Sequence, residues 1–210
     1  MICLKNVSKE FNKTKVLSDI NLNIDEGQLI RIVGNNGCGK TTLLKILAGI
    51  LKADDGDITY SEDCNIGAVI ENPSFIENES LLYNLKFLYN LKNKFSYDIC
   101  EKYCDLFSLD LNSKIAIKKY SLGMRQKAAI IQSVMENQNV IRLLLQEPDV
   151  LLLDEPTRGL DNDSMNQFDN LIKELKQEGK TIIICAHDGV ENIAFDRVLE
   201  IKKGKIEEKC

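Results

Sequence analysis

Residues 34–41 combine glycines, a lysine and a threonine at a spacing suited to binding phosphate. The run is Gly34-Asn35-Asn36-Gly37-Cys38-Gly39-Lys40-Thr41, which matches G-x-x-x-x-G-K-[ST]. Glycine adopts backbone angles that other residues avoid, so successive N–H groups can turn inward around a phosphate at a helix N-terminus. Lys40 would neutralise the β- and γ-phosphates, and the Thr41 hydroxyl would ligate Mg²⁺. An ordinary glycine-rich turn does not need the Lys-Thr pair, so we predict a nucleotide site that also includes Thr42.

Two adjacent carboxylates, Asp154 and Glu155, follow the apolar residues 151–153. Such a run is typical of a buried strand, and ligands bind at the C-terminal edge of strands in open α/β sheets. We expect Asp154 to hold Mg²⁺ through water and Glu155 to polarise an attacking water. The alternative is a solvated strand end, which the three leucines before the pair and the Pro-Thr after it disfavour.

Apolar periodicity predicts the elements that must position these residues. We expect strands at residues 2–7, 16–24, 28–33, 65–70, 149–153 and 180–186, and two short strands around the turn at 203–204. Helices are expected at 40–51, 81–91, 97–107, 122–135 and 164–178. Strand and helix alternate between residues 149 and 186, which is typical of a parallel sheet. Between about residues 74 and 138 the pattern is mostly helical and indicates a separate lobe.

Composition limits the class of protein. The chain has 210 residues, 44% of them hydrophobic and 28% charged, which favours a globular domain with one sizeable core. The formal net charge of −5 argues against a nucleic-acid partner. The seven cysteines show no C-x-x-C spacing, so we expect reduced, structural thiols. No apolar run is long enough to cross a bilayer and no signal peptide is recognised, so we expect a cytoplasmic protein.

Residues 120–126 extend these motifs to a resemblance with the ATP-binding cassette (ABC) family. The sequence Tyr-Ser-Leu-Gly-Met-Arg-Gln is similar to the signature loop usually written Leu-Ser-Gly-Gly-Gln. It lies between the phosphate loop and the acidic strand, as the family requires, and its form resembles cassettes of the bacitracin and lantibiotic resistance type. The resemblance covers nearly the whole chain. It implies an α/β fold with a P-loop NTPase (RecA-like) core and mainly parallel sheet, an N-terminal antiparallel β subdomain and an inserted helical subdomain.

The same resemblance implies the domain limits and several roles. Residues 1–210 form one ABC ATPase domain, with the core in 1–73 and 146–210 and the helical lobe in 74–145. Ser121 and the Gly123 amide would close on the γ-phosphate held by a partner cassette. His187, the only histidine, matches the switch histidine that contacts the γ-phosphate. Phe11 stands at the adenine-stacking position, where its ring would cover the base.

The chain departs from the family pattern at several positions. Glu71 stands where the family normally has a glutamine that touches Mg²⁺ and the attacking water. Leu122 replaces a glycine of the signature loop, beside the unusual residues Tyr120 and Met124. Residues 140–148 form an extra segment before the acidic strand, for which we expect one or two further amphipathic turns. Residues 159–161 resemble the D-loop, which runs along the dimer seam in the family.

The resemblance implies an ATP-hydrolysing subunit of a membrane transporter, with export favoured. It would bind ATP and Mg²⁺, pair head to tail around two ATP molecules, and work with separate transmembrane permease subunits at the inner face of the membrane. Lys40, Glu155 and His187 are the expected catalytic residues, and no nucleic-acid partner is expected.

Three alternatives stay open at this point. A soluble ABC-type ATPase of translation or DNA repair usually has long coiled coils, two cassettes or a basic face, which are not visible. A P-loop kinase or GTPase would share only residues 34–41, and the chain has no Asn-Lys-x-Asp guanine motif. A non-catalytic cassette is disfavoured because Lys40, Asp154, Glu155 and His187 are all present.

Overall fold

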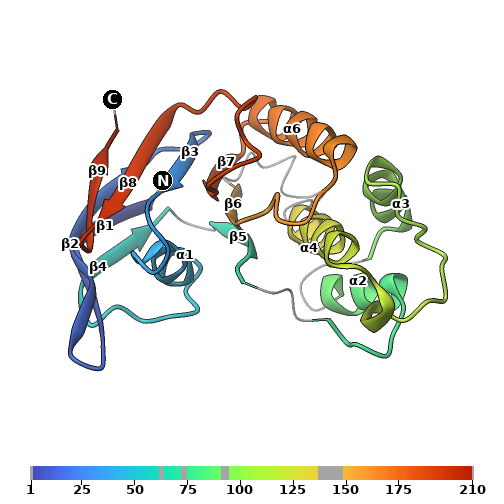
Figure 1. The fold of residues 1–210 in the computed structure, drawn as a ribbon, viewed down its shortest axis with the longest axis horizontal. Coiled ribbons are helices and arrows are strands. Elements are labelled where there is room, and N and C mark those ends of the chain that lie inside the picture. The colour runs from blue at the N-terminus through green and yellow to red at the C-terminus, as the bar shows by residue number, and fades with distance from the viewer. Residues whose placement is uncertain (1, 62–63, 72–74, 91–94, 137–148, 210) are drawn as a thin grey trace.

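The computed structural model describes residues 2–61, 64–71, 75–90, 95–136 and 149–209. Two sheets stand beside a lobe of helices (Figure 1). The expected α/β architecture, with an antiparallel N-terminal sheet and a mainly parallel sheet, is confirmed. The expected lobe boundaries at 73/74 and 145/146, and the extra segment 140–148, lie outside the described residues.

The first sheet has three antiparallel strands in the order β2-β1-β4. They are β1 (Ile2–Phe11), β2 (Thr14–Ile24) and β4 (Asp55–Tyr60). The turn between β1 and β2 has positive φ at Asn12 (49°) and Lys13 (64°), the geometry that matches the twist of a two-residue hairpin. Sequence analysis did not predict β4. Most of its residues are exposed, so it carries no apolar alternation by which it could be recognised.

The second sheet has six strands in the order β5-β6-β7-β3-β8-β9. They are β3 (Leu29–Val33), β5 (Asn65–Val69), β6 (Asp149–Asp154), β7 (Thr181–Cys185), β8 (Arg197–Lys202) and β9 (Lys205–Glu208). All neighbouring pairs are parallel except β8 and β9. Parallel strands end at the same edge, so the segments that follow β3, β6 and β7 meet there.

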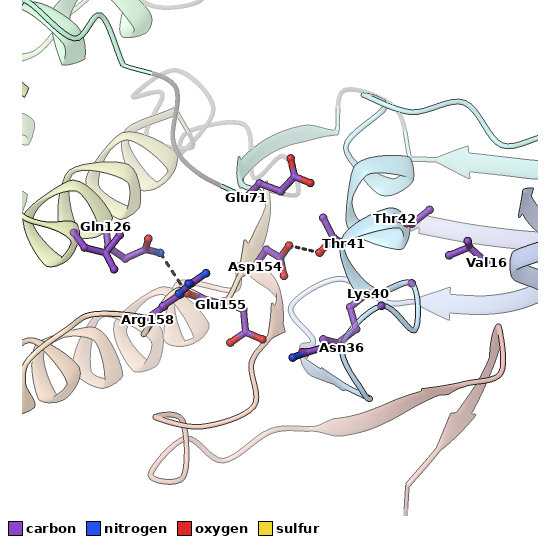
Figure 2. A pocket seen from close by; sticks show the side chains of 13 residues that line it. Val16, Asn36, Lys40, Thr41, Thr42, Glu71, Gln126, Asp154, Glu155 and Arg158 are labelled. Atoms are coloured by element: carbon purple, nitrogen blue, oxygen red, sulfur yellow. Dashed lines mark hydrogen bonds between the residues drawn. The ribbon is translucent and has the colours of Figure 1, made fainter. Parts of the chain in front are cut away.

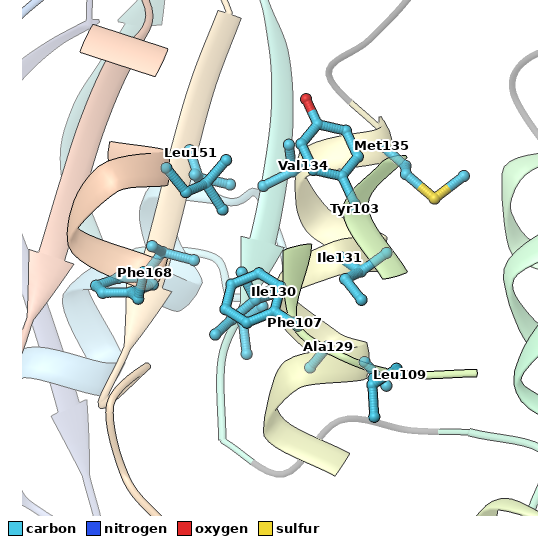
Figure 3. Packing of buried hydrophobic residues seen from close by; sticks show 14 of the residues in the cluster. Tyr103, Phe107, Leu109, Ala129, Ile130, Ile131, Val134, Met135, Leu151 and Phe168 are labelled. Atoms are coloured by element: carbon cyan, nitrogen blue, oxygen red, sulfur yellow. The ribbon is translucent and has the colours of Figure 1, made fainter. Parts of the chain in front are cut away.

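The described helices are α1 (Lys40–Leu47), α2 (Leu81–Tyr89), α3 (Tyr97–Leu106), α4 (Leu122–Glu136) and α6 (Asn162–Gln177), with a short 3₁₀ turn η1 (Ile117–Lys119). Helix α1 covers one face of this sheet, α4 and α6 cover the other, and α2 and α3 pack on α4 in the lobe (Figure 1). Alternate residues of β6 enter different cores. Val150 and Leu152 pack on the side of α1 and the antiparallel sheet. Leu151 packs with Phe168 of α6 and Ile130 of α4 on the other side (Figure 3). The helical lobe is therefore joined to the sheet by a continuous apolar core.

Helix ends are set by local chemistry. The side chains of Ser80 and Ser96 cap α2 and α3, and Asp161 caps α6. The helix expected at 40–51 ends at Leu47, four residues earlier than predicted. Gly49 has a φ of +69°, a left-handed conformation that terminates helices.

Sequence analysis expected reduced thiols and no segment that could cross a bilayer, and the described cysteines and helices bear on both expectations. The described cysteines are free thiols. Burial raises the pKa of Cys100 and of Cys104 to about 12, so both are neutral packing groups at physiological pH. Among the described helices, none is both long and apolar enough to cross a bilayer.

Candidate functional site

The phosphate loop connects β3 to α1 at the carboxyl edge of the parallel sheet. Its conformation needs glycine at two positions. Gly34 has a φ of +147°, and a Cβ there would lie 2.6 Å from the Ile201 carbonyl oxygen. Gly39 has a φ of +113°, and a Cβ there would lie 2.9 Å from Leu17 Cδ2. Residues with side chains would strain the loop at both points, so the glycine spacing fixes how the loop enters α1.

Lys40 is the first residue of α1 and is 7% exposed. Its Nζ donates to the carbonyl oxygens of Gly34 at 2.7 Å and of Asn35 at 3.4 Å. The same Nζ lies 3.1 Å from Nε2 of His187, which is also 3.2 Å from Oδ1 of Asn36. Because an ammonium group can only donate, His187 Nε2 acts as the acceptor of the Lys40 contact. The segment after β7 is thereby held against the phosphate loop.

Asp154 ends β6 beside the first turn of α1. It is 8% exposed, and the Thr41 hydroxyl donates to its Oδ2 at 2.6 Å (Figure 2). Burial raises the pKa of Asp154 above its ordinary value, while the Thr41 hydrogen bond and the charge of Lys40 act in the opposite direction. The fold thus brings a hydroxyl and a carboxylate from distant segments into direct contact.

Glu155 follows Asp154 but points elsewhere, as Figure 2 shows. Its φ of +48° is left-handed, which is uncommon for a residue with a side chain and is frequent at functional sites. The backbone N–H donates to the Cys185 carbonyl at 2.7 Å, which anchors this conformation to β7. Oε1 of Glu155 lies 3.9 Å from Nε2 of His187. The two carboxylates therefore face different parts of the site.

Glu71 lies just after β5 and also has a left-handed φ, of +61°. Its Oε1 accepts from Lys45 Nζ of α1 at 2.8 Å. The carboxylate faces the same site as Asp154, and its charge helps to raise the Asp154 pKa, after the larger effect of burial. The structure thus places Glu71 near Asp154 and pairs it with Lys45.

A cavity of about 610 Å³ joins these groups. It brings together nine of the residues named from the sequence, namely Asn36, Gly37, Gly39, Lys40, Thr41, Thr42, Glu71, Asp154 and Glu155. His187 contacts Lys40 but does not itself line the cavity. Gly34, Asn35 and Cys38 belong to the loop but also do not line the cavity.

Four further residues line the cavity that sequence analysis did not assign to it: Val16, Leu122, Gln126 and Arg158. Gln126 lies one helical turn after Leu122 on α4, and its Nε2 donates to the Glu155 carbonyl oxygen at 3.4 Å. The i, i+4 spacing was a usable signal. Arg158 lies in the tight turn after Glu155, where its N–H donates to the Glu155 carbonyl at 3.2 Å. For Val16, an ordinary strand residue, the sequence holds no signal.

The signature residues lie at the start of α4. Ser121 Oγ accepts from the Met124 N–H at 3.2 Å and so caps the helix. A Cβ on Gly123 would lie 2.4 Å from the Gly159 carbonyl oxygen, so only glycine allows this approach. Leu122 between them is 54% exposed. The signature segment and the D-loop-like segment are therefore in contact within one chain.

The loops after β6 and β7 are also linked, because Thr157 Oγ1 donates to the Asp188 carbonyl at 2.9 Å. Phe11 is more remote. It ends β1, is 44% exposed, does not line the cavity, and has Lys9 Nζ 5.4 Å from its ring centroid.

The donor set suits Mg²⁺ shared with phosphates. Among the described residues, no three His, Cys, Asp or Glu side chains cluster to form a metal cage made of protein alone. Thr41 and Asp154 offer two adjacent hard oxygens, and Mg²⁺ is usually held by one or two carboxylates together with substrate phosphates. The backbone of the phosphate loop, the Lys40 ammonium group, the Thr41 and Asp154 oxygens and the separate Glu155 carboxylate can together bind a nucleotide and activate water.

Comparison with known proteins adds independent evidence. A sequence model of the ABC transporter family matches residues 17–158. The uncharacterized ABC transporter ATP-binding protein YdbJ of Bacillus subtilis is 34% identical, over 97% of this chain and 67% of that protein. The lantibiotic transport ATP-binding protein SrtF of Streptococcus pyogenes is 32% identical, over 98% of this chain and 89% of that protein. A dimeric structure of the bacterial ABC transporter cassette MJ0796 superposes with a TM-score of 0.84 at 25% identity, covering 100% of this chain and 98% of that one.

Proposed function

Because this chain belongs to the ABC transporter family, we propose that its cavity binds and hydrolyses ATP to drive a membrane exporter through separate transmembrane subunits. The observation that carries the proposal is the convergence of β3, β6 and β7 on one cavity. At that edge stand Lys40, Thr41, Asp154, Glu155 and His187, whose contacts are described above. The family membership favours this over a kinase or GTPase, which would need only the phosphate loop.

We assign the following roles to these residues. Lys40 neutralises phosphate charge, and Glu155 accepts the proton of the attacking water, with His187 holding the γ-phosphate. The Thr41 hydroxyl and Asp154 hold Mg²⁺, which when bound supplies charge neutralisation at the phosphates. Glu71, once released from Lys45, offers acceptor oxygens to the same region. Phe11 covers the face of the adenine.

We propose that two copies sandwich two ATP molecules, each completing the other's site with Ser121 and Gly123. The exposure of Leu122 in a single chain supports this, because an apolar side chain at the rim of a polar cavity is stabilised when a second surface covers it. The superposed MJ0796 cassette is itself a dimer in its solved structure, which supports pairing of this chain as well.

The helical lobe supports contact with a permease. On α2, Tyr83 and Phe87 are 48% and 45% exposed and stack with nearly parallel rings, 6.4 Å apart between centroids. Exposed aromatic pairs are typical of protein interfaces. We place the protein on the cytoplasmic face of the membrane, held there by the permease. The naming of one relative as a lantibiotic transport protein favours export.

The test is the mass in solution of Glu155→Gln, measured by light scattering with and without Mg-ATP. Removing the base while keeping the side-chain size is expected to trap the ATP-bound pair, so the mass doubles only with nucleotide. Glu178→Gln, which changes an exposed glutamate after α6, is the matched control and is expected to hydrolyse ATP and stay monomeric. A Glu155→Gln protein that still releases phosphate at the wild-type rate would show that Glu155 is not the base.

A further inference from the structure

Arg31 is a charged residue in the interior of a central strand. It lies in β3, where it pairs with Ile184 of β7 on one side and Val198 of β8 on the other. Its neighbours Ile30 and Ile32 are fully buried in the core beneath α1. Arg31 itself is partly buried, and a charge that is partly withdrawn from water is stabilised by polar partners.

Among the described residues, the hydrogen-bond acceptors of Arg31 are two consecutive backbone carbonyls just beyond β7, and its charge also interacts with the Glu191 carboxylate. Nη2 donates to the His187 carbonyl oxygen at 2.5 Å and to the Ala186 carbonyl oxygen at 3.3 Å, and Nε also donates to Ala186 at 3.3 Å. The guanidinium carbon lies 6.0 Å from the centroid of the Phe195 ring, which closes the other side. These donors are therefore directed at one short piece of main chain.

These two carbonyls belong to the peptide groups on either side of the His187 Cα. Holding both peptide planes restricts the φ and ψ of His187 and hence the direction of its side chain. That direction places Nε2 3.1 Å from Lys40 Nζ and 3.9 Å from Glu155 Oε1. We propose that Arg31 is a positioning residue for ATP hydrolysis, which acts by holding the main chain of His187. The inference rests on the proposed role of His187.

Arginine suits this task better than lysine. A planar guanidinium presents several donors in a rigid arrangement and can hold two acceptors together, whereas an ammonium is a flexible point charge. Substitution by lysine is therefore expected to keep part of the effect, and substitution by methionine to remove it.

The kinetic test compares Arg31→Met and Arg31→Lys with Arg197→Met as a matched control. Arg197 lies on the adjacent strand β8 and also donates to a backbone carbonyl, that of Asn23 at 2.7 Å, which lies far from His187 in the fold. We expect kcat for ATP to fall by roughly 10- to 100-fold in Arg31→Met, the usual cost of a slightly misplaced group, with KM nearly unchanged. Arg31→Lys should be intermediate and Arg197→Met near wild type.

A double substitution separates positioning from general damage. In a His187→Ala background, Arg31→Met is expected to cause no further loss of kcat, because the group it positions is absent. Multiplicative losses would overturn the proposal, as would a wild-type kcat in Arg31→Met. If wild type itself releases no phosphate from ATP, the proposed function fails, and the inference is decided by the next measurement.

That measurement does not depend on activity. His187 is the only histidine, so ¹⁵N-histidine labelling yields a single imidazole in the NMR spectrum. Without nucleotide, we expect its signals to shift and sharpen in Arg31→Met as the ring leaves Lys40, and to stay in place in Arg197→Met. Unchanged imidazole signals in a folded Arg31→Met or Arg31→Lys protein would overturn the inference.

Discussion

Replacing Thr41 by valine tests the contact between the phosphate loop and the acidic strand. Valine has nearly the shape of threonine and a similar helix propensity, so the main change is the loss of the hydroxyl donor. Asp154 would keep its buried carboxylate without its closest hydrogen bond. Thr41→Ser is the matched control, because it keeps the hydroxyl and removes only a methyl group.

The expected magnitude follows from the geometry. The donor–acceptor distance of 2.6 Å is in the range of charge-assisted O–H···O⁻ bonds, and Asp154 is only 8% exposed, so water replaces the bond poorly. Hydrogen bonds to charged groups contribute about 1.5–3 kcal/mol. We therefore expect Thr41→Val to lower the free energy of unfolding at pH 7 by about 1.5–3 kcal/mol relative to Thr41→Ser.

The assay is urea unfolding without nucleotide at several pH values. The Thr41 bond lowers the pKa of Asp154, so it stabilises the ionised carboxylate. Its contribution is present where Asp154 is ionised in the folded protein and fades as the pH falls through the Asp154 pKa. The difference in free energy of unfolding between Thr41→Val and Thr41→Ser should therefore become smaller at acid pH. Equal stability of Thr41→Val and Thr41→Ser at pH 7 would refute this reasoning.

Three other substitutions have defined outcomes. Burial raises the pKa of Asp154 in the folded protein, so the folded state is favoured while this carboxyl is protonated and loses that stabilisation as the pH rises through the folded pKa. Asp154→Asn stays neutral, so at pH 7 it should unfold at a higher urea concentration than wild type. The difference in urea midpoint should disappear below the ordinary aspartate pKa. In Gly123→Ala the new Cβ would lie 2.4 Å from the Gly159 carbonyl oxygen, an overlap that costs about 1–3 kcal/mol, of which the better helix propensity of alanine offsets ~1 kcal/mol, so the variant should have a lower free energy of unfolding by up to about 2 kcal/mol; a more stable variant would contradict the close approach. Phe11→Leu should weaken ATP binding roughly tenfold in a fluorescence titration, since stacking on a base contributes about 1–3 kcal/mol, while Phe11→Tyr should not; equal affinities would remove Phe11 from the site.

The parts of the fold that were predictable are those with their own periodicity. Strands β6 and β7 are short, mostly apolar runs, and β3 is one interrupted by Arg31; α4 and α6 carry apolar residues at helical spacing, so each of these elements was located within a few residues. Strand β4 has no such pattern, because pairing with β1 holds it in place and burial contributes little. Its existence depends on a partner that periodicity in its own residues does not reveal.

The site residues likewise differ in whether the sequence around them reveals their role. Lys40, Thr41, Asp154 and Glu155 lie within contiguous motifs, so local spacing indicates their chemistry. Arg31 has no such motif, since its partners are main-chain carbonyls 155 and 156 residues further along the chain. Backbone acceptors are the same at every residue, and only the three-dimensional structure shows which ones a side chain reaches.

The sheet order has a consequence for how such a protein can diversify. The groups that we propose as reacting groups are carried by the ends of adjacent parallel strands, whose spacing of roughly 4.8 Å is a property of the backbone and not of particular side chains. The exposed strand β4 and the aromatic face of α2 lie on other elements. Substitutions there leave the strand ends, and therefore the spacing of these groups, unchanged. The architecture thus separates the framework that sets the spacing of the site from surfaces that can vary without changing that spacing.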